Sequence, residues 1–392
     1  MMLEEQKLGK LKQLLIYLMD HNAFYKSIQN NLQFDIHNDD IQEIYNKLPI
    51  VTKQDIINNP DIFFSETIKG EEIFEERTSG STGNVLKCYK TNTERTLLAL
   101  NIWKQRRKFD PMVNISNYYN LFNNEMEEII GKFYNVDDKM VIRNFYRLMA
   151  VQPRWIAGPI SLLSKFAILI NEEKINYKND GTLKFIEFHG ENVDEKSRKF
   201  IEETFQCKTI NNYGTSETWC IALDCDNQKL HIQDYIIADS KKDGEEDKLL
   251  ITSLINKYMP IVKYANGDCG KPIEKDCDCH NNNSVIWLKG GRETDYITGT
   301  SVLGNYLFDE ILWQAFERFG SVVHEYQVFQ QELKKFEFII AKGNHYSEDV
   351  TQFLHSRILQ ELGADNQVNF SFVDHVKALS NGKLKKFHPY KN

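Results

Sequence analysis

The sequence predicts an α/β protein, in which a large N-terminal domain of layered sheets and helices is followed by a small α+β domain. The first observation is length, because 392 residues exceed the usual size of a single domain. The second is a strand, helix and strand pattern over residues 183–188, 194–205 and 207–211, which is typical of parallel strands covered by helices. The third is a change of pattern toward the C-terminus. We therefore expect domains at residues 1–295 and 296–392.

The small domain is expected to contain two strands, a helix and a further strand. These elements follow from alternating and helical patterns of apolar residues. They are predicted near residues 322–329, 336–341, 348–362 and 368–373.

The composition is that of a globular protein with an acidic charge balance. Hydrophobic residues make up 41% and only eight residues are proline, which excludes a fibrous or disordered chain. The net charge of -8 disfavours a nucleic-acid partner, because phosphate backbones attract basic surfaces. The apolar run at residues 8–19 is interrupted by Lys10, Lys12 and Gln13, so it predicts an amphipathic helix instead of a signal peptide or membrane span. We expect a cytoplasmic protein with no membrane partner.

A segment rich in glycine and hydroxyl groups lies between two strand-like runs, at residues 73–77 and 85–91. Its sequence is Thr78-Ser79-Gly80-Ser81-Thr82-Gly83. Glycines allow backbone N–H groups to approach a phosphate closely, and hydroxyl groups add further donors. The segment matches neither a Walker loop nor a dinucleotide fingerprint. By itself it fits a phosphate-binding loop and an ordinary hairpin tip equally well.

Two polar segments follow the strands of the predicted βαβ unit. His189-Gly190-Glu191-Asn192 comes after the first strand, and Asn212-Tyr213-Gly214-Thr215-Ser216-Glu217 comes after the second. Ligands of open α/β sheets collect at the carboxyl ends of the strands. Both segments are therefore candidates for a ligand site.

Five motifs, read in order along the chain, resemble the core motifs of the adenylate-forming superfamily. They are residues 78–83, residues 212–217, Tyr264-Ala265-Asn266-Gly267-Asp268, Gly291-Arg292-Glu293-Thr294-Asp295 and Gly382-Lys383. The resemblance covers the chain from about residue 70 to the end. It is closest to the phenylacetate-CoA ligase and coenzyme F390 synthetase-like branch, because of the short chain, the segment at residues 152–159 and the Cys277-x-Cys279 pair.

The resemblance implies that the chain binds ATP. The loop residues Ser79, Gly80, Ser81, Thr82 and Gly83 would bind the β- and γ-phosphates. Gly190 and Glu191 would border the adenine, near which Tyr213 would stack. Asp268 would bind the ribose hydroxyls with its two acceptor oxygens, helped by Arg292. The other nucleotide-binding residues implied are Gly214, Thr215 and Ser216.

The resemblance also implies the catalytic residues. Glu217 would hold Mg²⁺, a hard cation that prefers oxygen ligands. Lys383 would bridge the substrate carboxylate and the α-phosphate, where it neutralises the charge that builds during attack. Asp295 matches the hinge about which the small domain turns.

These implications describe a ligase that activates a carboxylic acid as its acyl-adenylate and passes the acyl group to a thiol. The branch favours an aryl or arylacetic acid and coenzyme A. A carrier-protein thiol or an amine in a biosynthetic pathway would use the same first half-reaction, and a homodimer is compatible with all of these alternatives.

Four residues suggest a structural zinc site. The seven cysteines of an apparently cytoplasmic chain favour metal binding over disulfides. Cys277 and Cys279 are expected to join Cys225 and His231, which gives the four ligands that tetrahedral zinc takes. His280 is a competing ligand.

The sequence also departs from the superfamily pattern. Residues 84–87 lack the usual proline and carry the lysine one position late, and the ribose motif has Ala265-Asn266 where an arginine and a threonine are usual. These departures support one rival, a catalytically silent, zinc-stabilised nucleotide-binding protein. A second rival is a phosphoryl transferase that uses the glycine-rich loop.

Overall fold

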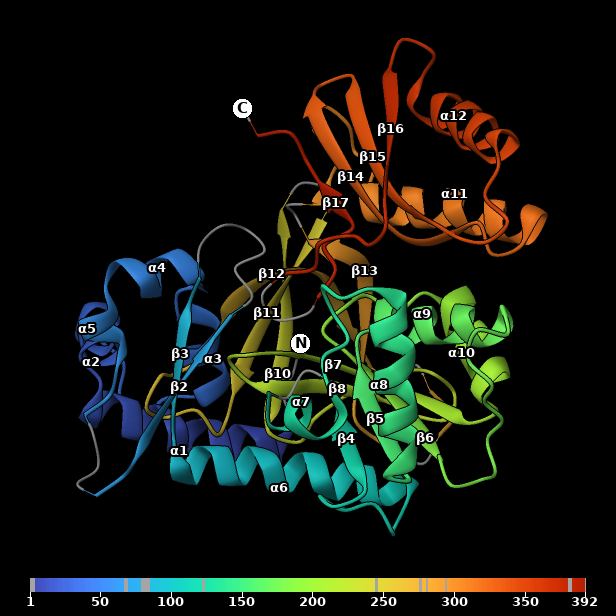
Figure 1. Ribbon diagram of the computed structural model, residues 1–392. Helices are drawn as coiled ribbons and strands as arrows, with labels where there is room; N and C mark the ends of the chain where they lie inside the picture. The colour runs from blue at the N-terminus through green and yellow to red at the C-terminus, as the bar shows by residue number, and fades with distance from the viewer. Residues whose placement is uncertain are drawn as a thin grey trace. The chain divides into compact units, whose positions relative to one another are not determined.

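The computed structural model describes residues 4–66, 70–78, 85–121, 124–243, 246–274, 277–279, 281–292, 295–379 and 383–391 (Figure 1). The chain divides into two compact units, each built from two separate stretches. Unit 1 comprises Met1–Met112 and Asn212–Lys289, and unit 2 comprises Val113–Asn211 and Gly290–Asn392. The expected domain boundary at residue 295 stays a prediction.

Unit 1 begins with five helices, of which the first three share a small core with Ile237 and Val262, while α4 and α5 pack into the core of the large sheet. Leu11, Leu14 and Leu18 recur on one face of the first helix and are fully or almost fully buried, which confirms the predicted amphipathic helix. Burying each such side chain stabilises the fold by about 1.5–3 kcal/mol. The helices are α1 (Glu5–His21), α2 (Ala23–Leu32), α3 (Ile41–Lys47), α4 (Lys53–Asn58) and α5 (Pro60–Phe63).

The strands of unit 1 form a large sheet and a separate hairpin. In the sheet the order is β10-β11-β12-β13-β9-β8-β7, and β1 pairs with β12. Its members are β1 (Val51–Thr52), β7 (Lys208–Thr215), β8 (Trp219–Asp224), β9 (Leu230–Ile232), β10 (Ile236–Asp243), β11 (Glu246–Ser253), β12 (Tyr264–Ile273) and β13 (Val285–Arg292). The hairpin pairs β2 (Ile73–Arg77) with β3 (Lys87–Thr91) in antiparallel register, as predicted around the glycine-rich loop. Helix α6 (Asn92–Phe109) follows β3 directly through a Thr91/Glu94 capping box.

Unit 2 contains the predicted βαβ pattern. Its strands follow the order β7-β6-β5-β4, where residues 208–211 of β7 belong to this unit, and β4, β5 and β6 are parallel to one another. The elements are β4 (Tyr118–Asn120), α7 (Asn124–Ile130), α8 (Asp138–Ala150), β5 (Trp155–Gly158), α9 (Ile160–Asn171), β6 (Phe185–His189) and α10 (Glu195–Phe205). Phe145, Phe166 and Phe205 bring α8, α9 and α10 into one buried aromatic cluster.

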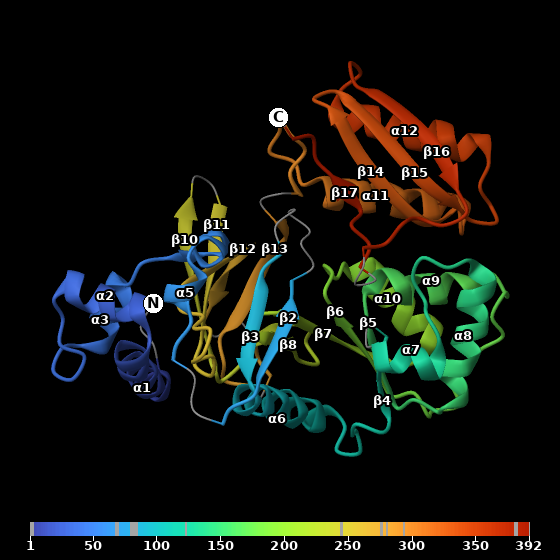
Figure 2. The ribbon, with the colours of Figure 1, turned by 60° about the vertical axis from the view of Figure 1, so that its left-hand side comes forward.

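The C-terminal part of unit 2 folds around a four-stranded sheet of order β16-β15-β14-β17. Two helices lie on one face of this sheet (Figure 2), where Phe308, Phe338 and Leu354 share a buried core. The elements are α11 (Gly304–Phe319), β14 (Val323–Glu332), β15 (Lys335–Lys342), α12 (Glu348–Leu362), β16 (Gln367–Val373) and β17 (Phe387–His388). The predicted strands and helix are confirmed, whereas α11 and β17 were not predicted.

One expected loop is a strand. Residues 212–215 were predicted to lie beyond the end of a strand, but they are the second half of β7 and pair antiparallel with β8. Residues with polar side chains can form a strand here because their backbone N–H and C=O groups are hydrogen-bonded to β8. Side-chain polarity alone gives no information about these backbone bonds.

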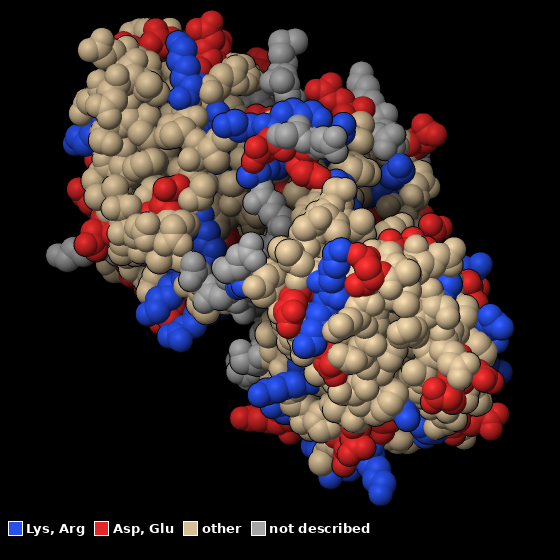
Figure 3. All heavy atoms as spheres, turned by 90° about the horizontal axis from the view of Figure 1, so that it is seen from above, with Lys and Arg blue, Asp and Glu red and all other residues tan. Residues whose placement is uncertain are grey.

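Helix hydropathy and surface charge bear on the environment of the protein. Among the described residues, no helix combines the length and apolar character that crossing a bilayer requires. On the face shown in Figure 3, Lys and Arg side chains are interspersed with Asp and Glu.

Candidate functional site

The phosphate loop itself, with Ser79, Gly80, Ser81, Thr82 and Gly83, lies outside the described residues. Its flanks are well held. The N–H of Thr78 donates to the Leu86 carbonyl, and the N–H of Leu86 donates to the Thr78 hydroxyl, both at 2.9 Å. Lys53 also donates to that hydroxyl at 3.3 Å. These bonds close the base of the hairpin from which the loop extends.

Tyr213 and Asp268 lie together in unit 1. The Tyr213 hydroxyl donates to Asp268 Oδ2 at 2.7 Å, and the Asn266 amide donates to the Tyr213 oxygen at 2.9 Å and to Asp268 Oδ2 at 3.0 Å. Strand β7 has an irregular register between Tyr213 and Gly214. A Cβ at Gly214 would come within 1.7 Å of the Trp219 carbonyl oxygen, so only glycine fits there.

Glu217, the expected Mg²⁺ ligand, is 6% exposed. Tyr264 donates its hydroxyl to Glu217 Oε1 at 2.9 Å, and Asn256 donates its amide to the Glu217 carbonyl at 3.0 Å. The two bonds fix both the side chain and the backbone of this residue. Tyr264 therefore acts as an orienting partner of the carboxylate, a contribution that sequence reasoning missed.

An ion pair between the buried Lys90 and the partly exposed Glu76 lies beside the turn before Glu217. Lys90, which is fully buried, donates to Glu76 at 2.9 Å and to the Ser216 carbonyl at 2.6 Å. The Trp219 indole N–H donates to the same Glu76 oxygen at 2.9 Å. This role of Lys90 was not predicted from the sequence. The alternation of a strand could have indicated it, because it places Lys90 on the same buried face of β3 as Cys88.

The other expected site residues near Glu217 make fewer and longer hydrogen bonds. Thr215 and Thr218 have hydroxyl oxygens 3.3 Å apart, and the Ser216 hydroxyl donates to the Arg77 carbonyl at 3.5 Å. Arg292 is the last residue of β13, and the structure does not describe its side chain. Asp295 follows after two residues that are not described, and its hinge role stays a prediction.

In unit 2, Lys383 lies against Gly190 at the carboxyl end of β6. Gly190 has φ +84°, and a Cβ there would come within 2.5 Å of Lys383 Cε and 2.7 Å of Nζ. The next residue, Glu191, accepts hydrogen bonds from Leu384 N at 2.9 Å and from Ser161. The adjacent site residues Gly190 and Glu191 therefore contact the distant Lys383–Leu384 segment.

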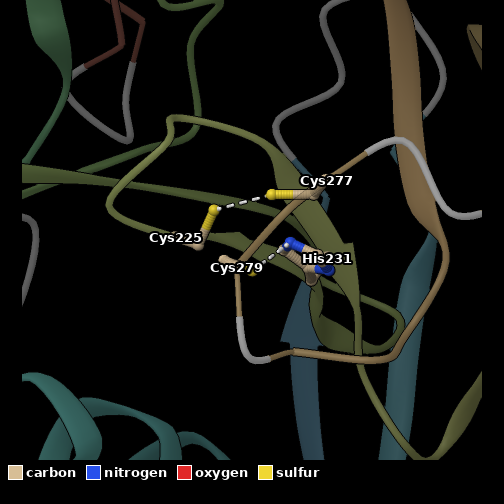
Figure 4. A group of neighbouring side chains, drawn as sticks. All are labelled: Cys225, His231, Cys277 and Cys279. Carbon is tan, nitrogen blue, oxygen red and sulfur yellow. Dashed lines mark hydrogen bonds between the residues drawn. The ribbon is translucent and has the colours of Figure 1, made fainter.

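The four expected metal ligands are also brought together, in unit 1 (Figure 4). The ligand atoms of Cys225, His231, Cys277 and Cys279 all lie within 4.8 Å of one another. Cys225 Sγ is 3.6 Å from Cys277 Sγ, and Cys279 Sγ is 3.2 Å from His231 Nε2. A tetrahedron with zinc–sulfur bonds of about 2.3 Å has edges of about 3.8 Å, which is close to these separations.

The imidazole of His231 is oriented for metal binding. Its Nδ1 lies 2.8 Å from the Asn283 carbonyl oxygen, so Nδ1 carries the proton and Nε2 faces the sulfur atoms. Burial raises the pKa of Cys225 to about 11. Burial would also raise the pKa of Cys277, but the hydrogen bond from the Cys279 backbone N–H and the contacts with the neighbouring side chains of the cluster outweigh it and lower that pKa to about 6. The expected competitor His280 lies outside the described residues.

Solved structures with the same fold are acyl-CoA and aryl-CoA ligases. A 2-hydroxyisobutyryl-CoA ligase in the postadenylation state, in complex with 2-HIB-AMP, is similar with a TM-score of 0.72 and 16% identity, over 98% of this chain and 89% of that one. The anthranilate CoA ligase AuaEII, in complex with anthranoyl-AMP, has a TM-score of 0.59 and 12% identity, over 82% and 66%. A benzoate CoA ligase from Burkholderia xenovorans LB400 has a TM-score of 0.53 and 12% identity, over 82% and 69%.

The chain thus has the fold of the adenylate-forming ligases, which confirms the resemblance drawn from the five motifs at the level of fold. More particularly, residues 301–387 match the family of the CapK C-terminal domain. A comparison with curated proteins finds no match. The narrower assignment to the phenylacetate-CoA ligase branch stays a prediction.

Proposed function

We propose that this chain is an ATP-dependent ligase that converts a carboxylic acid into its acyl-adenylate and then transfers the acyl group to a thiol. The observation that carries the proposal is the placement of Lys383 against Gly190 at the carboxyl end of β6. Strand ends of this kind are where α/β sheets bind ligands. A cationic side chain there suits a reaction in which two anions must meet.

In the first half-reaction, an oxygen of the substrate carboxylate attacks the α-phosphorus of ATP. The bond between the α-phosphorus and its bridging oxygen breaks, and pyrophosphate leaves with the electron pair. Lys383 bridges the carboxylate and the α-phosphate, and it offsets the charge that gathers on the phosphoryl oxygens. In the second half-reaction the acceptor sulfur attacks the acyl carbonyl, and AMP leaves.

The residues of unit 1 serve the nucleotide in this proposal. Asp268 binds the ribose hydroxyls, and its carboxylate is held in place by Tyr213 and Asn266. Glu217 holds Mg²⁺ through a carboxylate that Tyr264 orients. Lys90 keeps the Ser216–Glu217 turn in position through the Ser216 carbonyl.

For the substrate we propose an aryl or arylacetic acid, with coenzyme A as the acceptor. Support comes from the anthranilate and benzoate ligases that share the fold. A carrier-protein thiol or an amine is the alternative acceptor.

We further propose that Cys225, His231, Cys277 and Cys279 hold a structural zinc ion. Three sulfur atoms and one imidazole nitrogen are the donors that tetrahedral zinc prefers, and four protein ligands leave no position open for a substrate. Cys225 follows β8 and His231 lies in β9, while both other cysteines precede β13. The ion would therefore tie together two segments that β9–β13 pairing already joins.

The decisive experiment measures pyrophosphate release and nucleotide products with a panel of aromatic, arylacetic, aliphatic and amino acids. A ligase gives AMP and pyrophosphate with at least one acid, and Lys383→Ala abolishes this while ATP still binds. Lys391→Ala, an exposed lysine nearby in sequence, is the matched control. ADP as the product would identify a phosphoryl transferase, and no turnover with any acid would favour a silent nucleotide-binding protein.

A further inference from the structure

Helix α9 begins without a cap of its own. Its N-cap residue is Pro159, which makes no side-chain cap hydrogen bond. The carboxylate of Glu191 takes that place from a different segment of the chain. The backbone N–H of Ser161 donates to Glu191 Oε2 at 3.0 Å, and the Ser161 hydroxyl donates to Oε1 at 2.9 Å. A carboxylate is well suited here, because the start of a helix presents unpaired N–H groups and a positive dipole end.

The same carboxylate also holds the segment that carries Lys383. The backbone N–H of Leu384 donates to Glu191 Oε1 at 2.9 Å. On the other side, the Lys383 carbonyl accepts from the N–H of Leu379 at 2.9 Å. The Lys383–Leu384 segment therefore contacts the Gly190–Glu191 pair twice, through the Lys383 side chain and through the Leu384 backbone.

We propose that Glu191 is a positioning residue for Lys383 in the adenylation half-reaction. This inference rests on the proposed ligase function. The resemblance to other ligases implies only that Glu191 borders the adenine. The geometry points to a different use of its side chain, because the two carboxylate oxygens together accept three hydrogen bonds from α9 and the Lys383 segment.

Because Glu191 acts through Lys383, it should affect the rate of adenylation and not the rate of acyl transfer. Lys383 bridges the attacking carboxylate and the α-phosphate of ATP, and this meeting of two anions occurs only in adenylation, because the thiol attacks the uncharged acyl carbonyl of the acyl-adenylate. Removing the carboxylate loosens the Leu384 anchor, so the Lys383 ammonium spends less time in its working position. The rate of adenylation should fall, whereas the rate of acyl transfer should not.

The test uses the full-length chain with Glu191→Ala and Glu191→Gln, and with the acid that the panel identifies. We expect the kcat of pyrophosphate release to fall about 10- to 100-fold in Glu191→Ala, since a hydrogen bond to a charged group contributes about 1.5–3 kcal/mol. Glu191→Gln retains acceptor oxygen and should fall less. The KM for ATP and the rate of acyl transfer from separately supplied acyl-adenylate should change by no more than about twofold. Glu203→Gln, an exposed carboxylate on α10, is the matched control and should behave as wild type.

Three outcomes would overturn the inference. A raised KM for ATP with unchanged kcat would make Glu191 a nucleotide contact, as the resemblance implies. An equal loss in both half-reactions would make it a purely structural residue. Wild-type rates in Glu191→Ala would make the three hydrogen bonds irrelevant to catalysis. Failure of the wild-type chain to adenylate any acid would instead refute the ligase proposal itself, and with it this inference.

If Glu191→Ala does not fold, Ser161→Ala serves as the second variant. It removes the hydroxyl bond to Glu191 Oε1 and leaves the Ser161 and Leu384 backbone donors in place. It should lower the kcat of adenylation by a smaller factor than Glu191→Gln and spare acyl transfer, whereas no selective effect in either variant would contradict the proposal.

Discussion

The hydroxyl of Tyr213 donates to Asp268 Oδ2 at 2.7 Å, which links the strand after α10 to the proposed ribose-binding carboxylate. Asn266 donates to both partners and completes a closed triangle. The superfamily usually has threonine at this position of the ribose motif. In this chain the asparagine contributes to orienting the carboxylate, so the altered motif does not leave Asp268 unsupported.

Tyr213→Phe tests this triangle, because it removes the donor and keeps the aromatic ring. We expect the KM for ATP to rise about 3- to 10-fold with little change in kcat, since one hydrogen bond contributes about 0.5–1.5 kcal/mol. Steady-state pyrophosphate release checks the result. Tyr306→Phe, whose side chain is 65% exposed, is the control. An unchanged KM would show that the bond does not serve nucleotide binding.

Gly190→Ala should impair the proposed catalytic lysine directly. The new methyl group would meet Lys383 Cε, and the φ of +84° is unfavourable for alanine by about 1–2 kcal/mol. We expect the rate of pyrophosphate release to fall strongly, while urea denaturation of the same sample shows that the protein is still folded and only slightly less stable. Gly9→Ala, where a Cβ would meet nothing within 4 Å, is expected to retain full activity. Equal activity of the two variants would contradict the placement of Lys383.

Removal of the proposed zinc should lower stability without touching the chemistry. We expect about one zinc per chain in the purified protein, lost in Cys277→Ser together with several degrees of thermal stability. Metal analysis and thermal denaturation with and without a chelator provide the measurement. Cys207→Ser, a cysteine outside the cluster, should keep the metal. A wild-type protein that contains no zinc, and whose melting temperature does not change with the chelator, would disprove the site.

A buried charge network in unit 2 predicts how stability depends on pH. His324 on β14 lies 3.4 Å from Asp138 and 3.0 Å from Glu172, with Nδ1 and Nε2 as the respective nitrogens. Burial alone would lower the pKa of His324, but the two carboxylates outweigh it and raise that pKa above its ordinary value. Burial raises the pKa of Glu172, but hydrogen bonds from His324, Ser321 and Lys174 outweigh it and lower that pKa to about 2.

The signs of these shifts define the pH window. A raised histidine pKa means that the stabilisation is complete below the unfolded value of about 6.5 and is lost as pH rises through the folded pKa. The lowered carboxylate pKa means that its share is complete above about 4.5 and is lost as pH falls toward 2. Stability from this network is therefore greatest between these limits.

His324→Gln should lower the urea midpoint most at about pH 5.5 and least well above the histidine pKa. Urea denaturation of wild type and variant from pH 5 to pH 9, about one unit apart, measures the difference. The exposed His375 provides the control substitution, His375→Gln. A difference that does not change with pH would show that His324 is not charged in the folded protein.

Local patterns in the sequence determined most of the elements and indicated the candidate site residues. The βαβ unit, the hairpin around the glycine-rich loop and most of the C-terminal strands follow from periodicity, because side chains on one face of an element share one environment. The order of five motifs identified the fold. The spacing of Cys225, His231, Cys277 and Cys279 pointed to a metal, since few other arrangements need those residue types.

Only the tertiary structure decided which partners orient these residues. That Glu191 caps α9 and holds Leu384, that Lys90 supports Ser216 and that Tyr264 orients Glu217 depends on contacts between segments 30 to 193 residues apart. Periodicity reports which face of an element is buried, but it carries no information about the direction of a hydrogen bond across such distances. For this reason the sequence indicated the candidate reacting groups, and the folded chain shows which side chains hold them in place.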